Sequence, residues 1–131
     1  MITESLFKKF VWLDIALWPA LFLAFYFQPQ TISNLYEVME TVPSFLDTGT
    51  GLAIGVINLI LFFVSYFFLL KFMKLGKILY PLAFVTGLFL DYHSGIIISS
   101  NFLVILDTIT SMLSGVIILL LFTSPIKDKF R

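Results

Sequence analysis

Cysteine is absent from the 131-residue chain, and histidine occurs once. The absence of cysteine excludes disulfides, thiolate-bound metals and thiol redox chemistry. Charged residues are also scarce: they make up 12% of the sequence, whereas soluble domains carry roughly a quarter. The charges cancel to a formal net charge of zero, which argues against a nucleic-acid partner. With so little charge, the chain cannot present an ordinary water-facing surface.

The sequence is instead rich in apolar residues. They make up 60% of the chain, with 16 Phe, and the mean hydropathy is +1.04. A bilayer core about 30 Å thick needs roughly 20 mostly apolar residues per helix. Suitable stretches lie at about 10–27, 51–70, 78–98 and 102–122. The sequence therefore predicts an all-α, integral membrane four-helix bundle in the lipid bilayer, with residues 1–131 forming a single transmembrane domain.

Two of these spans need comment. The first follows Lys8 and Lys9 as a signal peptide would, but it is long and contains Asp14 and Pro19, which favours a retained helix. In the third, too few residues precede Asp91 to cross a membrane, so we expect the helix to continue to residue 98.

The basic residues all lie at span ends that share one side of the membrane. They are Lys8, Lys9, Lys71, Lys74, Lys77, Lys127, Lys129 and Arg131. By the positive-inside rule, this distribution places both termini in the cytoplasm. We therefore expect a multi-pass protein of the plasma (inner) membrane.

Residues 28–50 form the long outer loop. Apolar residues recur in it at helical intervals, and "NLYE" at 34–37 has the spacing of a capping box. We expect a short amphipathic helix on the outer membrane surface, broken near Pro43. It is either an anchored connector or a lid or docking surface for a partner.

Each span has one face of small or polar residues, as helix packing in lipid favours. On the first span this face is an alanine seam formed by Ala16, Ala20 and Ala24. On the second span the face comprises Gly51, Gly55, Asn58, Phe62, Ser65 and Tyr66. On the third span it comprises Tyr80, Ala83, Gly87, Asp91 and Ser94, and on the fourth span Asp107, Thr110, Ser111 and Ser114. Because the last two connections are short, we expect the second, third and fourth spans to be antiparallel neighbours.

Three polar residues are predicted to meet inside the bundle near its outer end. Asp91 follows Lys77 by about 21 Å of helix, at about 1.5 Å per residue. Asn58 and Asp107 lie at a similar depth on the second and fourth spans, and Ser111 is a weaker candidate one turn beyond Asp107. A buried aspartate costs about 2.5–3.5 kcal/mol on insertion scales, so two of them indicate a role.

Two interpretations of this cluster are open. It is either a proton- or cation-responsive site or a hydrogen-bonded cluster that fixes helix register, with one aspartate neutral and bonded to Asn58 or a serine. In either case, two close carboxylates in a low dielectric do not both ionise readily.

His93 and Asp14 are weaker candidates. His93 is about 200° around the helix from Asp91, so we expect it to face the interface rather than the bundle. A metal site with Asp91 and Asp107 would require a helix break near residue 94, and we expect no metal. Asp14 lies shallowly in the first predicted span, opposite the alanine seam, and is either a carrier carboxylate or, more simply, an acid that reaches toward the nearby lysines.

The C-terminal segment "SMLSGVIILLLFTSPIKDKF" resembles the last helix of small, uncharacterised bacterial four-helix inner-membrane proteins. The matching positions are Ser114, Gly115, Ser124, Pro125 and Phe130. The resemblance implies a four-helix inner-membrane protein and carries no activity or site residue.

No nucleophile paired with a base, glycine-rich phosphate loop or HExxH pair is present, so we expect no catalytic residue and no cofactor. The first functional hypothesis is a non-enzymatic accessory or partner-binding subunit, associating with copies of itself or with another membrane protein. The alternative is a small oligomeric proton- or cation-coupled transporter or channel that uses the intramembrane carboxylates. An enzyme or redox subunit is a distant third.

Overall fold

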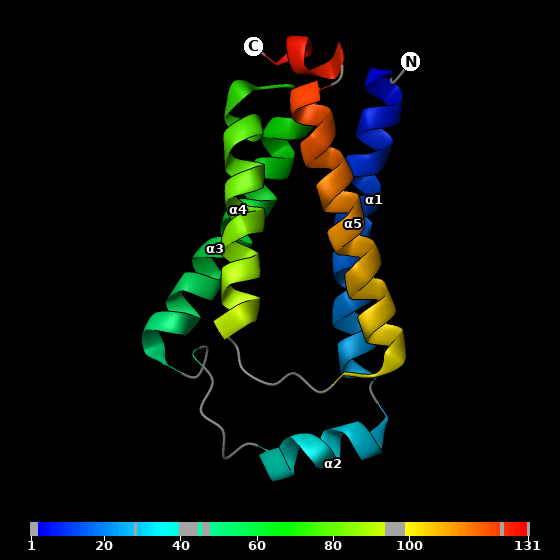
Figure 1. Ribbon diagram of the computed structural model, residues 1–131, viewed down its shortest axis with the longest axis vertical. Coiled ribbons are helices and arrows are strands. Elements are labelled where there is room, and N and C mark those ends of the chain that lie inside the picture. Colours follow the sequence, from blue (N-terminus) through cyan, green and yellow to red (C-terminus); the bar gives the residue numbers. More distant parts are fainter. Residues whose placement is uncertain are drawn as a thin grey trace.

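The computed structural model describes residues 3–27, 29–39, 45, 48–93, 99–123 and 125–130, and these form an all-α bundle (Figure 1). Its elements are α1 (Glu4–Tyr26), α2 (Gln30–Met39), α3 (Gly49–Leu70), α4 (Lys74–His93), α5 (Asn101–Thr123) and the 3-10 helix η2 (Pro125–Lys129). In this part of the chain, four helices, α1, α3, α4 and α5, are long and apolar enough to cross a membrane. The predicted all-α four-helix bundle is confirmed, and the protein is a small multi-pass membrane protein.

Capping residues explain where the helices begin. α1 begins at Glu4 rather than at residue 10, because Thr3 accepts a hydrogen bond from the backbone N–H of Leu6 at 3.2 Å. Thr48 caps α3 in the same way through the N–H of Gly51 at 3.0 Å. A short helix, α2, does lie in the long loop; it begins at Gln30, so the capping-box spacing at 34–37 falls inside the helix rather than at its start. The predicted continuation of α4 to residue 98, and the break near residue 43, lie outside the described residues.

The four long helices form two antiparallel pairs. α3 packs along α4, and α1 packs along α5, whereas contacts between the two pairs are fewer. The predicted neighbours α3 and α4 are confirmed, but α4 and α5 contact each other only slightly, because α5 packs mainly against α1. In Figure 1 the pairs lie together near the two chain termini and apart near α2.

Aromatic side chains close the end of the bundle that carries both termini. Phe7, Phe72 and Phe130 form a triangle with ring centroids 5.4–6.1 Å apart. η2 follows α5 and adds the buried Ile126 to this cluster. We call this the closed end, and we call the opposite end, near α2, where the two helix pairs lie apart, the open end.

The turn between α3 and α4 is part of the closed end. Phe72 adopts a left-handed conformation (φ 54°), and the N–H of Met73 donates to the carbonyl of Phe68 at 2.9 Å. These are the features of a Schellman cap. A Cβ on Gly76 would lie 2.8 Å from the backbone nitrogen of Leu69, so the turn requires glycine at this position.

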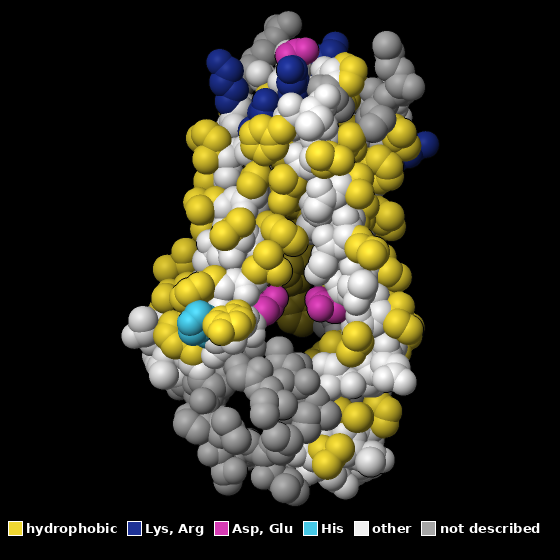
Figure 2. Space-filling model, in the orientation of Figure 1, with side chains coloured by type: hydrophobic (Ala, Val, Ile, Leu, Met, Phe, Trp, Pro, Cys, Tyr) yellow, Lys and Arg dark blue, Asp and Glu magenta, His cyan; other side chains and the backbone are white. Residues whose placement is uncertain are grey.

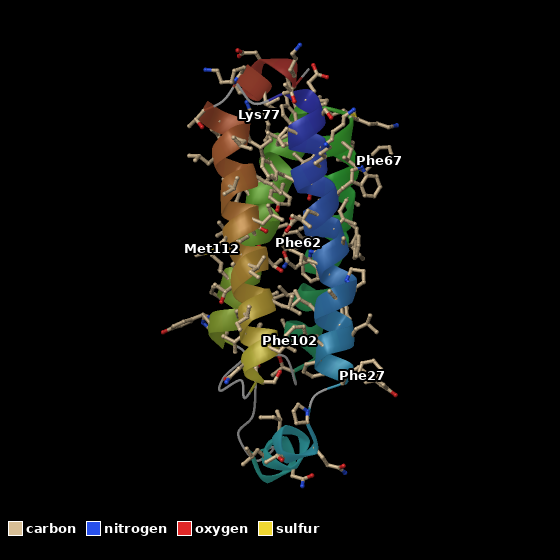
Figure 3. The ribbon with its side chains drawn as sticks, turned by 90° about the vertical axis from the view of Figure 1, so that its right-hand side faces the viewer. Phe27, Phe62, Phe67, Lys77, Phe102 and Met112 are labelled. Atoms are coloured by element: carbon tan, nitrogen blue, oxygen red, sulfur yellow. The ribbon has the colours of Figure 1, made fainter. Side chains whose placement is uncertain are left out.

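The outer surface of the bundle is apolar. Large side chains such as Trp12 and Phe67 are more than half exposed, as expected of a surface that contacts lipid. In the side view, Phe67 and Met112 point outward, whereas Phe62 lies between the helices (Figure 3). Lysines gather at the closed end (Figure 2). The two ends of the bundle therefore differ in charge, as the positive-inside pattern requires.

Candidate functional site

A cavity of about 310 Å³ lies between the two helix pairs. All four long helices line it, and Figure 2 shows a hollow flanked by two acidic side chains. Because α4 and α5 contact each other only slightly, the helix pairs separate here and leave the space open.

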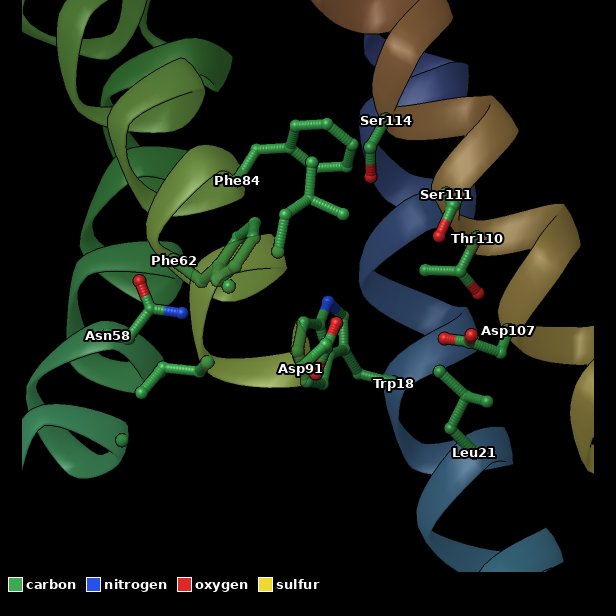
Figure 4. Close-up of a pocket in the computed structure, with 14 residues that line it drawn as sticks. Trp18, Leu21, Asn58, Phe62, Phe84, Asp91, Asp107, Thr110, Ser111 and Ser114 are labelled. Carbon is green, nitrogen blue, oxygen red and sulfur yellow. The ribbon is translucent and has the colours of Figure 1, made fainter. Parts of the chain in front are cut away.

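The three polar residues predicted to meet all line this cavity. Asn58 belongs to α3, Asp91 to α4 and Asp107 to α5. The two aspartates belong to different helix pairs, and both are exposed rather than buried. Their carboxyl groups are directed into the space between the pairs (Figure 4). The cavity thus has acidic groups on opposite walls.

Asn58 differs from the two aspartates in its burial. Only 7% of its surface is exposed, and its Oδ1 atom has no hydrogen-bond partner among the residues that the structure describes. Gly87 of α4 allows close approach, since a Cβ there would lie 3.4 Å from the Asn58 Nδ2 atom. An unpaired buried acceptor costs about 1–3 kcal/mol, so the amide oxygen lowers the stability of the bundle.

A polar stripe along α5 connects the acidic part of the cavity to its deeper part. Asp107, Thr110, Ser111 and Ser114 all line the cavity. The Thr110 hydroxyl donates to the carbonyl of Leu106 at 2.9 Å, which directs it along its own helix. From Asp107 to Ser114 the stripe extends about 10 Å, at about 1.5 Å per residue.

Aromatic side chains from both helix pairs also line the cavity. Trp18, Phe62 and Phe84 line the cavity, and the rings of Trp18 and Phe62 lie 5.4 Å apart. Aromatic faces attract cations, most strongly where water is excluded. The cavity therefore combines negative charge with a surface that favours an organic cation.

Asp14 is placed differently from its prediction. It lies opposite the alanine seam, as expected, but it is fully buried and does not reach toward the lysines. The Tyr66 hydroxyl donates to its Oδ2 atom at 2.8 Å, Tyr80 donates to the same oxygen, and the Ser114 hydroxyl lies 3.3 Å from Oδ1. The indole N–H of Trp18 donates to the Tyr66 hydroxyl at 2.9 Å. These five residues, which we call the Asp14 network, link all four long helices.

The error for Asp14 came from the start of the helix. With α1 beginning at Glu4, Asp14 lies about 15 Å along the helix, at about 1.5 Å per residue, rather than one turn from its end. The signal was present in the sequence: Phe7, Val11 and Asp14 recur at helical spacing and form the buried face of α1.

His93 lies outside the cavity. It is exposed at the end of α4, its Nδ1 atom is 2.9 Å from the carbonyl of Phe89, and its ring packs 4.1 Å from the Phe89 ring. Among the described residues, no three His, Cys, Asp or Glu side chains come together as a metal site would require.

The site thus offers two carboxylates and aromatic faces around one space, with the buried Asp14 network next to it. This chemistry suits the binding of a positively charged solute. The chain matches no protein-family model, no curated protein and no solved structure.

Proposed function

We propose that the protein is a small membrane transporter that binds an organic cation in the cavity between its helix pairs. The observation that carries the proposal is the position of Asp91 and Asp107 on opposite walls of a cavity that Asn58 also lines. A cation placed there gains charge pairing from both pairs of helices and contact with aromatic rings.

The two ends of the bundle support a transport role. Asp91 and Asp107 lie toward the open end, while the Phe7, Phe72 and Phe130 cluster blocks the closed end. If the lysines mark the cytoplasmic side of a plasma membrane, the cavity belongs to the outer half of the bundle. A solute enters from outside in this arrangement, and transport requires the closed end to open.

Cation binding by purified protein in detergent tests the proposal. Isothermal titration calorimetry with tetraethylammonium chloride is compared with sodium chloride and potassium chloride. We expect Asp91→Asn and Asp107→Asn each to weaken tetraethylammonium binding about tenfold or more, which corresponds to about 1.4 kcal/mol. Asp128→Asn is the matched control, because Asp128 is exposed on η2 at the other end of the bundle.

The proposal fails if the wild-type protein binds none of the three cations, or if both cavity variants bind tetraethylammonium as well as the control does. Binding of sodium or potassium alone would replace the organic cation with an inorganic one. Uptake of the bound cation into proteoliposomes then separates transport from simple binding.

The second candidate is the accessory or partner-binding subunit. It is favoured by the alanine seam, because Ala16 is exposed and Ala20 and Ala24 line an outward groove beside Phe102 and Leu106 of α5. Small residues on an outer face let another helix approach closely, whether from a second copy or from another membrane protein. A mass measurement in mild detergent tests this: Ala20→Leu should reduce any oligomer to the monomer, and a wild-type monomer without bound protein contradicts it.

A further inference from the structure

Asp14 has no part in the cavity chemistry described above, although it is fully buried. Trp18 and Ser114 belong to both sites, and of these two Ser114 is the one that contacts Asp14. Ser114 lines the cavity, and its hydroxyl also lies 3.3 Å from the Oδ1 atom of Asp14. A proton that enters the cavity therefore needs one intermediate group to reach the buried carboxyl group.

The hydrogen bonds show which form of Asp14 the network fits. The indole N–H of Trp18 is a donor only, so the Tyr66 oxygen accepts from it and the Tyr66 proton is directed to Asp14. Tyr80 donates to the same carboxyl oxygen. Two hydroxyl donors on one oxygen stabilise the ionised form of Asp14, because hydrogen bonds to a charged acceptor are stronger.

We propose that Asp14 is a proton-binding site that is loaded from the cavity through Ser114, and that its ionised form holds the two helix pairs together. The Asp14 Oδ1 atom is the position at which the proton binds, since both tyrosines already donate to Oδ2. The consequence for solute movement rests on the proposed transport function; proton binding itself does not.

The proton step balances without another reactant. Hydronium in the cavity gives a proton to the Ser114 oxygen while the original Ser114 proton passes to Asp14 Oδ1. One O–H bond of hydronium and the original Ser114 O–H bond break, and new O–H bonds form on Ser114 and on Asp14. The products are water, an intact serine and a neutral Asp14.

Proton binding changes the contact between the helix pairs. Asp14 and Ser114 belong to the α1–α5 pair, whereas Tyr66 and Tyr80 belong to the α3–α4 pair. Hydrogen bonds to a carboxylate are stronger than those to a neutral acid, so protonation weakens the two bonds that cross between the pairs. For the closed end to open, the two helix pairs must separate at the level of Asp14.

Within the Asp14 network, Asp14 is the residue that we expect to bind and release a proton. α3 and α4 present Tyr66 and Tyr80, α5 presents the uncharged Ser114, and the described contacts of Asp14 include no Lys or Arg. Asp91 and Asp107 are the acidic residues of the cavity, so the experiment must separate their contribution from that of Asp14.

Trp18 provides a direct optical signal for the network. The chain has two tryptophans, and Trp12 is 59% exposed on the outer surface. In a Trp12→Phe background, the emission of Trp18 is recorded as the pH is lowered, without any cation substrate. We expect a single transition, which Asp14→Asn abolishes and Asp107→Asn retains. Circular dichroism and gel filtration check that each variant is folded.

Two further variants keep the carboxyl group. Tyr80→Phe removes one donor to the ionised form, so the transition should move to higher pH. Ser114→Ala removes the intermediate group, so the emission should change more slowly after a rapid pH jump. The proposal is overturned if the transition survives in Asp14→Asn or disappears in Asp107→Asn. An unchanged rate in Ser114→Ala overturns the route through the serine.

The proposed transport function has a separate outcome. A Trp18 transition that depends on Asp14, together with no binding of tetraethylammonium, retains the proton site and rejects the organic-cation cavity. Cation binding that depends on Asp91 and Asp107, without any Asp14-dependent transition, gives the opposite result.

Discussion

The Tyr66 hydroxyl group both accepts a hydrogen bond from Trp18 and donates one to Asp14. Replacing Tyr66 with Phe leaves the indole N–H without its acceptor and removes one donor from a buried carboxyl group. We expect Tyr66→Phe to lower the free energy of unfolding by about 1–3 kcal/mol. Unfolding by SDS in mixed micelles, followed by circular dichroism, measures this change.

Tyr92 is the matched control for that experiment. It also lies on a membrane-spanning helix but is 84% exposed, so Tyr92→Phe should leave the free energy of unfolding nearly unchanged. Equal effects of the two substitutions would contradict the importance of the Asp14 network for stability.

Asn58 provides a test that separates stability from function. Asn58→Leu replaces the buried amide and its unpaired oxygen with an apolar side chain of similar size. We expect the free energy of unfolding to rise by about 1–3 kcal/mol, because an unsatisfied acceptor is removed. Tetraethylammonium binding should weaken in the same variant. A loss of stability would show that the Asn58 amide forms contacts that hold the bundle together.

For single residues, the sequence predicts a position where the depth along a helix and the direction around the helix axis are enough to define it. Asn58, Asp91 and Asp107 could be placed at one level by counting residues from the span ends, and they line one cavity. The Asp14 network could not be assembled in this way, although Tyr66, Tyr80 and Ser114 were each assigned to inward faces. Its members come from four helices, and their contacts depend on which helices are neighbours.

Among the elements, the turn between α3 and α4 is the most tightly constrained. A methyl group on Gly76 would meet the backbone of Leu69, which cannot move without opening the Schellman cap. We expect Gly76→Ala to destabilise the protein by about 1–3 kcal/mol, as overpacking does. SDS unfolding of the purified variant measures the change.

Gly115 is the control within the same chain. It lies in α5 with no atom within 4 Å of an added Cβ. Because alanine favours helix more than glycine does, Gly115→Ala should be neutral or more stable by about 0.5–1 kcal/mol. If both substitutions destabilise equally, the close approach at residue 76 is not the cause.

The existence of the four long helices could be predicted, but their pairing could be predicted only in part. Apolar length identifies each span, and a short turn forces α3 and α4 to be neighbours. The α1–α5 pair joins segments that are far apart in the sequence, and the apolar pattern gives no preference for it. Helix starts were missed where a polar cap, such as Thr3, precedes the apolar residues.

At the scale of the whole molecule, the chain has a basic closed end and an acidic cavity toward its open end. This asymmetry predicts the orientation in the membrane. The natural absence of cysteine allows a direct test with single cysteines at Thr31 on α2 and Asp128 on η2. In intact cells, a membrane-impermeant maleimide should label Thr31→Cys and leave Asp128→Cys unlabelled.

Permeabilised cells provide the comparison for that labelling. Both cysteines should react once the membrane is opened, which shows that protection of Asp128→Cys came from the bilayer. Labelling of Asp128→Cys alone in intact cells would reverse the proposed topology and place the acidic cavity in the inner half of the bundle.

The α1–α5 pair also bears on how the protein is made. Helices enter the membrane in order, so Asp14 is inserted before any of its partners on other helices exists. On insertion scales an isolated aspartate costs about 2.5–3.5 kcal/mol at the bilayer centre. Tyr66 arrives with α3, Tyr80 with α4 and Ser114 only with α5. The nascent chain therefore carries an unstable first helix through most of its synthesis, and only the emergence of the last helix from the ribosome gives α1 its packing partner.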